Sequence, residues 1–205
     1  MLKTIRFAAY ALIVLLGLVW AGVWWRGADL GLENIGVSLP GGVSVGGPFE
    51  LVDARGAAVT DTTFRGRWML IYFGYTFCPD VCPTELQTMA AALERLGPLA
   101  ERVAPLFITI DPQRDTPTAV GEYVKLFDER IVGLSGSPER IAAAAKAYRV
   151  YFARARSKDT TDYLMDHSSF IYLVGPDGGF RALFRQGVAP QELADAIRSR
   201  MSAGG

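Results

Sequence analysis

The two cysteines of the chain, Cys78 and Cys82, are the residues whose chemistry stands out first. An apolar run at 68–75 precedes them and an amphipathic run at 83–96 follows. The pair therefore falls at the junction between an expected buried strand and an expected helix. A helix N-terminus favours the thiolate form of cysteine, which is both the nucleophile in disulfide exchange and the form that ligates metals.

The spacing of the thiols suits a shared metal at least as well as a disulfide. Common redox dithiols have two intervening residues, whereas here there are three, Pro79, Asp80 and Val81. Side chains four residues apart on a helix have Cβ atoms about 5–6 Å apart, and a disulfide needs about 3.5–4.5 Å. Two thiolates on one metal can lie up to about 4.6 Å apart. Because Pro79 favours a loop conformation for Cys78, the disulfide Cys78–Cys82 is not excluded.

The elements that must position the thiols follow from the hydrophobic pattern and the turn residues. Strands are expected at 49–52, 58–60, 68–75, 103–110, 131–134, 169–174 and 180–184, and helices at 83–96, 117–127, 138–148 and 190–201. Strands that alternate with helices and end in a hairpin and a helix imply an α/β fold, a mixed sheet flanked by helices on both faces. A dithiol at the strand-to-helix junction of the first crossover is the thioredoxin-like arrangement.

The one histidine, His167, is the third candidate ligand. It lies just before the strand at 169–174, and in thioredoxin-like folds the loop at this place faces the dithiol and usually carries a cis-proline. This chain has no proline between Pro138 and Pro176. The imidazole completes a Cys2His set, which favours Cu(I) and can also hold Cu(II). Zinc with an open fourth position is the competing metal.

Residues beside the ligands have two interpretations each. Asp80 and Asp166 are candidate second-shell groups that orient or tune the site, or they are turn residues bonded to local backbone. Met165 is expected to pack rather than to ligate. The polar segment 154–163 is a docking surface for a partner or a solvated loop.

The loop 111–115 has equally open roles. Its charged residues either lie near the site or cap the helix that follows, and they are Asp111, Arg114 and Asp115. Thr116-Pro117, directly after them, has the pattern of an N-cap followed by proline at the first helical position.

An uncharged run of 19 residues, 7–25, predicts an N-terminal transmembrane helix. Lys3 and Arg6 precede it, so the positive-inside rule predicts a cytoplasmic N-terminus and a periplasmic remainder. A cleaved signal peptide is the alternative, which bulky Trp24-Trp25-Arg26 disfavours. A bacterial inner membrane is favoured over a mitochondrial one, because no Arg- and Ser-rich transit segment precedes the run.

Composition and charge limit the remaining possibilities. The predicted division is a membrane anchor at 1–26, a Gly-rich linker at 27–47 and the thioredoxin-like, copper-binding domain at 48–205. Lys+Arg and Asp+Glu are 21 each, so no net charge attracts nucleic acid. Two cysteines are too few for a disulfide scaffold.

The chain resembles the Sco/SenC (synthesis of cytochrome c oxidase) proteins. The resemblance rests on Cys-Pro-Asp-Val-Cys-Pro at 78–83 and Asp-His-Ser-Ser at 166–169, and it covers about 47–201. Members of that family have a thioredoxin-like fold, bind one copper through both cysteines and the histidine, and help to assemble the dinuclear CuA centre of cytochrome c oxidase. The resemblance thus implies a membrane-anchored copper chaperone with Cys78, Cys82 and His167 as ligands.

The resemblance also implies partners and an alternative activity. The implied partners are subunit II of cytochrome c oxidase and other copper chaperones. Phe77 stands where many members have histidine, which leaves the three-ligand core intact. The alternative is a thiol–disulfide oxidoreductase that reduces the cysteines of the CuA site before metallation, with Cys78 as nucleophile and Cys82 as resolving thiol. A structural Cys78–Cys82 disulfide is the third hypothesis.

Overall fold

The structure is a computed structural model, and it describes residues 17, 45–155 and 163–203. The chain divides into two units, Met1–Asn34 and Ile35–Gly205. The predicted anchor at 7–25 lies, apart from Gly17, outside the described residues, as does most of the predicted linker. Among the residues that are described, no helix is long and apolar enough to cross a membrane.

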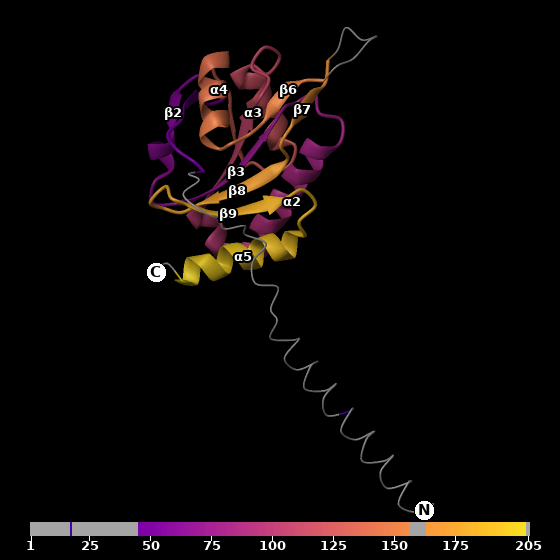
Figure 1. Cartoon of the computed structure of the whole chain (residues 1–205). Coiled ribbons are helices and arrows are strands. Elements are labelled where there is room, and N and C mark those ends of the chain that lie inside the picture. Colours follow the sequence, from indigo (N-terminus) through magenta and orange to yellow (C-terminus); the bar gives the residue numbers. More distant parts are fainter. Residues whose placement is uncertain (1–16, 18–44, 156–162, 204–205) are drawn as a thin grey trace, which may run out of the picture. The chain divides into compact units, whose positions relative to one another are not determined.

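A five-stranded mixed sheet in the order β5-β4-β3-β8-β9 forms the centre of the domain (Figure 1). Its strands are β3 (Trp68–Gly74), β4 (Val103–Thr109), β5 (Val132–Leu134), β8 (Phe170–Val174) and β9 (Phe180–Arg185). β3, β4 and β5 are parallel, and β8 and β9 are antiparallel to their neighbours. Every residue of β3 and β4 is buried, as expected of central strands covered on both faces. The hydrophobic pattern predicted each of these strands to within one residue at either end.

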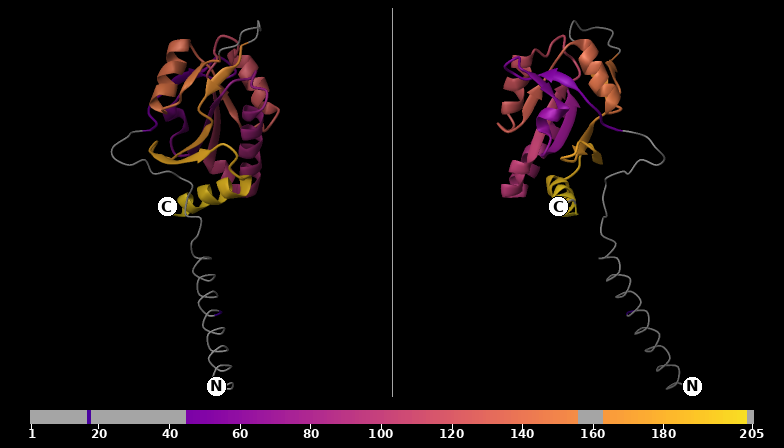
Figure 2. Two further views of the ribbon diagram at one scale, coloured as in Figure 1. Left: turned by 45° about the vertical axis from the view of Figure 1, so that its right-hand side comes forward. Right: turned by 90° about the vertical axis from the view of Figure 1, so that its left-hand side faces the viewer.

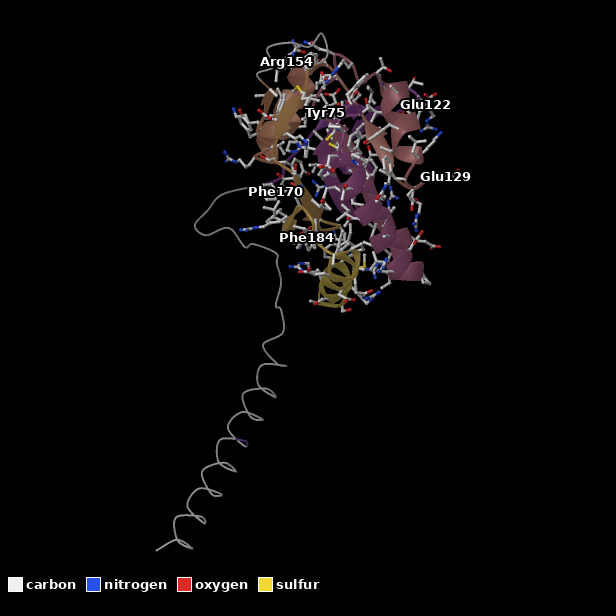
Figure 3. The ribbon with its side chains drawn as sticks, turned by 90° about the vertical axis from the view of Figure 1, so that its right-hand side faces the viewer. Tyr75, Glu122, Glu129, Arg154, Phe170 and Phe184 are labelled. Carbon is white, nitrogen blue, oxygen red and sulfur yellow. The ribbon has the colours of Figure 1, made fainter. Side chains whose placement is uncertain are left out.

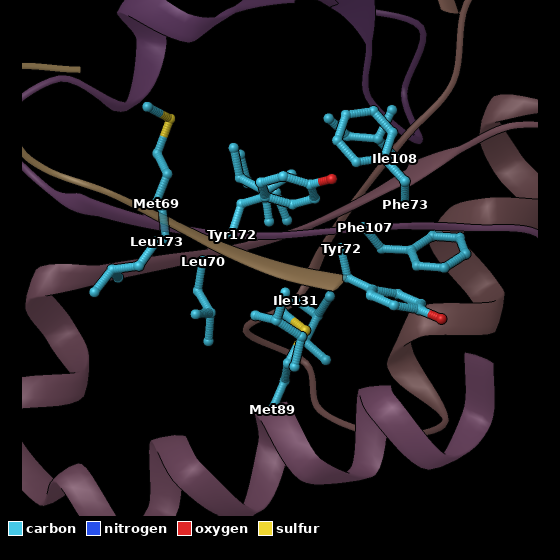
Figure 4. Packing of buried hydrophobic residues seen from close by; sticks show 14 of the residues in the cluster. Met69, Leu70, Tyr72, Phe73, Met89, Phe107, Ile108, Ile131, Tyr172 and Leu173 are labelled. Atoms are coloured by element: carbon cyan, nitrogen blue, oxygen red, sulfur yellow. The ribbon is translucent and has the colours of Figure 1, made fainter. Parts of the chain in front are cut away.

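Four α-helices flank the sheet. They are α2 (Val81–Leu96), α3 (Pro117–Lys125), α4 (Pro138–Ala147) and α5 (Pro190–Ala203), with short 3-10 helices η1 (Asp61–Phe64) and η2 (Gly97–Arg102). Met89 of α2 lies on the same side of the sheet as Leu70 (Figure 4). Tyr148, directly after α4, contacts the rings of Phe73 and Tyr172, whose side chains point to the opposite side. α5 packs along α2 (Figures 1 and 2).

The predicted helix starts at Thr116 and Ser137 are confirmed. The Thr116 hydroxyl accepts a hydrogen bond from the Ala119 N–H, and the Ser137 hydroxyl accepts one from the Arg140 N–H. Each cap is followed by proline at the first helical position, where the missing N–H costs no hydrogen bond. These caps define the N-terminus of α3, which precedes the short strand β5 in the chain, and that of α4, which follows it.

Two small antiparallel ribbons complete the domain. The predicted hairpin of β1 (Glu50–Val52) and β2 (Ala58–Thr60) is confirmed, and the Asp53 carboxylate closes its turn by accepting from the Arg55 and Ala57 N–H groups. The second ribbon pairs β6 (Phe152–Arg154) with β7 (Met165–His167). The prediction that His167 lies in a loop was wrong, since it ends β7, and Arg154, the first residue of the polar segment 154–163, belongs to β6. Three-residue strands leave too little periodicity for the sequence to reveal them.

Candidate metal centre

The loop after β3 and the first turn of α2 position the two cysteines. Cys82 is fully buried in the first turn of α2, whereas Cys78 lies before the helix and is partly exposed. The Cys82 N–H points to the Cys78 sulfur, with 3.4 Å between N and Sγ. Both thiols are free in the structure. The prediction that Cys78 precedes the helix is confirmed, because α2 begins at Val81.

The end of β3 makes room for the buried sulfur. A Cβ atom on Gly74 would lie 2.8 Å from Cys82 Sγ and 2.9 Å from the ring of Phe107, so only glycine fits there without displacement. The Tyr72 hydroxyl donates to Cys82 Sγ at 3.8 Å. Sequence reasoning missed both residues, because in an apolar strand they look like ordinary core positions.

His167 lies opposite the thiols as the last residue of β7. Its Nε2 is 3.7 Å from Cys82 Sγ. Its Nδ1 is 3.0 Å from the carbonyl oxygen of Ser168, and since a carbonyl only accepts, Nδ1 carries the proton. The lone pair of Nε2 is therefore directed to the sulfurs, as a metal ligand requires. The rings of Tyr72 and Tyr75 meet the imidazole edge-on, at centroid distances of 6.3 and 6.0 Å.

The ligand atoms of Cys78, Cys82 and His167 all lie within 4.8 Å of one another. The sequence named these three residues, and the fold brings them together from segments separated by 85 positions. Two sulfurs and one imidazole nitrogen form a soft donor set that fits Cu(I) and leaves further coordination positions open.

The two thiols have opposite acidities. A hydrogen bond from Cys82 lowers the pKa of Cys78, against the effect of burial. The same hydrogen bond raises the pKa of Cys82, and burial raises it further. The reduced site therefore consists of one partly exposed thiolate and one buried thiol. A metal that binds both sulfurs must displace the Cys82 proton.

The loop between β4 and α3 contacts the cysteine loop. Of the two interpretations of its charged residues, the contacts of Asp115 support a position near the site. Buried Asp115 accepts hydrogen bonds from the Thr76 N–H at 3.0 Å, from the Thr76 hydroxyl at 2.5 Å and from the Thr109 hydroxyl at 2.6 Å. Thr76 is two residues before Cys78, so Asp115 fixes the cysteine loop. The helix cap is Thr116 instead.

The two aspartates next to the ligands in sequence are both exposed. Asp80 is exposed and its side chain does not cap α2. Asp166 is exposed on β7, where side chains alternate between faces, so it points away from the face that His167 occupies. Among the described residues, the hydrogen bonds of Cys78, Cys82 and His167 involve neither carboxylate, and the second-shell role of Asp80 and Asp166 stays a prediction. Met165 packs against the core, as predicted. Most of the predicted docking segment 154–163 lies outside the described residues.

The cysteine loop and the imidazole-bearing ribbon meet at Tyr75, which lies between the ribbon and α2 (Figure 3). A thioredoxin-like mixed sheet, with a dithiol at the start of a helix and an imidazole on a small ribbon opposite it, defines a metal-binding member of the thioredoxin-like class. A family model described as SCO1/SenC matches residues 38–202, and the chain belongs to this family.

Curated relatives are mitochondrial and fungal proteins longer than the matched region. Protein SCO1 homolog, mitochondrial, of Homo sapiens is 43% identical over 159 residues, which are 77% of this chain and 53% of that protein. Protein sco1 of Schizosaccharomyces pombe is 46% identical over 158 residues, 76% of this chain and 60% of that protein. The chain thus spans between half and three fifths of the length of these relatives.

Solved structures match the described domain closely. Arabidopsis thaliana ScoI with copper bound has a TM-score of 0.73 and 40% identity, covering 78% of this chain and 99% of that one. Bradyrhizobium japonicum ScoI with copper bound has a TM-score of 0.69 and 46% identity, covering 75% of this chain and 98% of that one. These likenesses establish the thioredoxin-like α/β fold that the sequence predicted.

Proposed function

We propose that this chain is a copper metallochaperone that carries one copper ion on Cys78, Cys82 and His167 and supports assembly of the CuA centre of cytochrome c oxidase. The observation that carries the proposal is the convergence of two sulfurs and one imidazole nitrogen within 4.8 Å. The copper-bound structures of Arabidopsis and Bradyrhizobium ScoI, which belong to proteins at least 40% identical to this chain, support copper as the ion.

The geometry suits a carrier that must also release its cargo. Cys78 is partly exposed, so a ligand of an acceptor protein can approach the ion from that side. Three ligands leave a position open for such a ligand, and the ion can then pass from donor to acceptor without becoming free. Burial of Cys82 and the carbonyl-fixed tautomer of His167 hold the other two ligands in place.

Copper binding by the purified full chain in mild detergent tests this function. Under anaerobic conditions and with both thiols reduced, Cu(I) competition against a chromophoric chelator is expected to give one ion per chain. Copper that binds without fixed stoichiometry, or equally well to Cys78→Ser, would show that the site does not carry the ion.

The asymmetry of the two thiols favours a second candidate function, thiol–disulfide exchange with the cysteines of the CuA site. The Cys78 thiolate attacks one sulfur of the acceptor disulfide, and the other acceptor sulfur leaves as a thiolate. Cys82 then loses its proton and attacks Cys78 in the mixed disulfide, which yields a Cys78–Cys82 disulfide and a reduced acceptor dithiol. A dithiol reductant regenerates the pair. Here Cys78→Ser is expected to abolish turnover, while His167→Ala retains it.

We further propose that the run at 7–25 anchors the chain as a single-pass inner membrane protein, followed by a linker at 27–47 and the copper-binding domain at 48–205. The uncharged, Trp-rich composition of the run supports this. Subunit II of cytochrome c oxidase and other copper chaperones are the proposed periplasmic partners. Protease added to spheroplasts is expected to cleave the domain from outside; full protection of the domain would contradict the orientation.

A further inference from the structure

Arg114, an enclosed arginine beside the site, takes no part in the chemistry described above. It lies between β4 and α3, and its Nε donates to Oδ2 of buried Asp111 at 2.6 Å. Its side chain is 17% exposed, and its Nη2 atom is buried with no hydrogen-bond acceptor among the described residues. One ion pair therefore does not account for the position of this guanidinium, and its other contacts have to explain it.

Aromatic rings from two segments surround the guanidinium. Its Cζ atom lies 3.8 Å from the ring centroid of Tyr163, 4.6 Å from that of Phe77 and 5.9 Å from that of Tyr75. The last two rings belong to the segment that leads from β3 to the cysteines, and Tyr163 lies two residues before β7. Arg114 thus joins the cysteine loop to the ribbon through cation–π contacts.

Two of these rings continue the connection to the imidazole. The Tyr163 hydroxyl donates to Asp111 Oδ1 at 2.7 Å, so one carboxylate holds both the arginine and the tyrosine. The Tyr75 hydroxyl accepts from the Met165 N–H at 3.2 Å, and the Tyr75 ring meets the His167 ring at 86°. The described β6–β7 ribbon forms a sheet of its own, apart from the five-stranded sheet, and only two residues link it to β8, so such side-chain contacts help to hold β7 in place.

We propose that Arg114 is a positioning residue for His167: by binding Tyr163 and Tyr75, it fixes β7 against the cysteine loop and keeps the imidazole within reach of both sulfurs. Its effect on copper rests on the proposed function, but the geometry concerns the metal-free protein. Because the contact depends on a planar guanidinium between rings, lysine cannot replace it.

A double-mutant cycle on Cu(I) affinity tests whether Arg114 acts through the histidine. Arg114→Gln is expected to weaken Cu(I) binding about tenfold in the otherwise native chain, and less than about twofold in the His167→Ala background. Arg130→Gln is the matched control, because Arg130 also pairs with an aspartate, Asp128, but lies in the loop before β5, at the opposite end of the parallel strands. It is expected to change nothing. Equal losses in both backgrounds would overturn the proposal.

The single histidine gives a second readout without copper. In the metal-free full chain, the imidazole NMR signals of His167 are expected to broaden or shift in Arg114→Gln and in Tyr163→Leu, but not in Arg130→Gln. Tyr163→Leu removes the stacking while it leaves the buried Asp111–Arg114 pair intact, so misfolding cannot explain both results. Signals identical to wild type in both variants would refute the positioning role. If wild type binds no copper, the proposed function fails, and the NMR result still decides the role of Arg114.

Discussion

The cysteine side and the histidine side of the site are built in different ways. All seven residues of β3, which leads to the cysteines, are buried, and Cys82 begins a helix that packs on the core. None of the six residues of β6 and β7, the ribbon that carries His167, is buried. The thiols are therefore fixed by the fold itself, whereas the imidazole depends on a few side-chain contacts. The two sides of the site should therefore respond differently to substitution.

Loss of a thiolate should have the largest effect, because the cysteine side holds the ion most firmly. Structural zinc sites with four ligands contribute about 10–16 kcal/mol, or roughly 2.5–4 kcal/mol for each ligand. Cys78→Ser should therefore weaken Cu(I) binding roughly 100- to 1,000-fold. Competition with a chromophoric chelator measures this change. A loss below tenfold would mean that the ion is not held by both sulfurs.

His167→Ala should have a smaller effect on Cu(I), since two thiolates already satisfy this soft ion. We expect binding to weaken about 30- to 100-fold, which corresponds to roughly 2–3 kcal/mol. The same variant should lose the nitrogen hyperfine couplings of bound Cu(II) in electron paramagnetic resonance. Unchanged couplings would place a different nitrogen at the ion.

The dependence of Cu(I) affinity on pH should distinguish the two thiols. The pKa of Cys78 is lowered, so that thiol is already ionised at neutral pH, whereas the pKa of Cys82 is raised and its proton must leave when copper binds. One proton released means that Cu(I) affinity rises about tenfold for each pH unit. Chelator competition between pH 7.5 and 8.5 measures the slope. A hundredfold rise per unit would mean that both thiols are protonated in the metal-free site.

Substitutions on the cysteine side should lower the free energy of unfolding more than substitutions on the histidine side. Asp115→Asn leaves Thr76 and Thr109 with an amide in place of a buried carboxylate acceptor, which should cost about 2–3 kcal/mol of unfolding free energy. Tyr163→Phe removes the hydrogen bond that Tyr163, two residues before β7, donates to Asp111, and should cost under about 1 kcal/mol of unfolding free energy. Urea unfolding followed by circular dichroism compares them, with exposed Asp177→Asn as a control. A larger loss for Tyr163→Phe would reverse the ranking of the two sides.

The difference between the cysteine side and the histidine side also explains which parts of the site could be predicted from the sequence. Long apolar runs identify β3 and β4, and an amphipathic run identifies α2, so the location of Cys78 and Cys82 followed from local patterns. The approach of His167 followed only from the analogy with a thioredoxin-like loop. The ribbon itself was missed, because β6 and β7 pair across an intervening segment and are too short to show periodicity.

The neighbours of the ligands were the least predictable part. Asp80 and Asp166 were chosen for adjacency in sequence, but alternation along β7 turns Asp166 outward. Asp115 acts on Thr76 from a distance of 39 positions, which only the tertiary fold reveals. In this site, contacts that shape the ligands come both from neighbours in sequence, such as the Ser168 carbonyl, and from loops remote in sequence.

X-ray absorption spectroscopy of the Cu(I)-loaded full chain tests the ligand set most directly. We predict a first shell of two sulfurs and one nitrogen, with the nitrogen contribution absent in His167→Ala and the two sulfurs retained. A wild-type spectrum with sulfur ligands alone, or one unchanged in His167→Ala, would contradict the account of a Cys2His copper site.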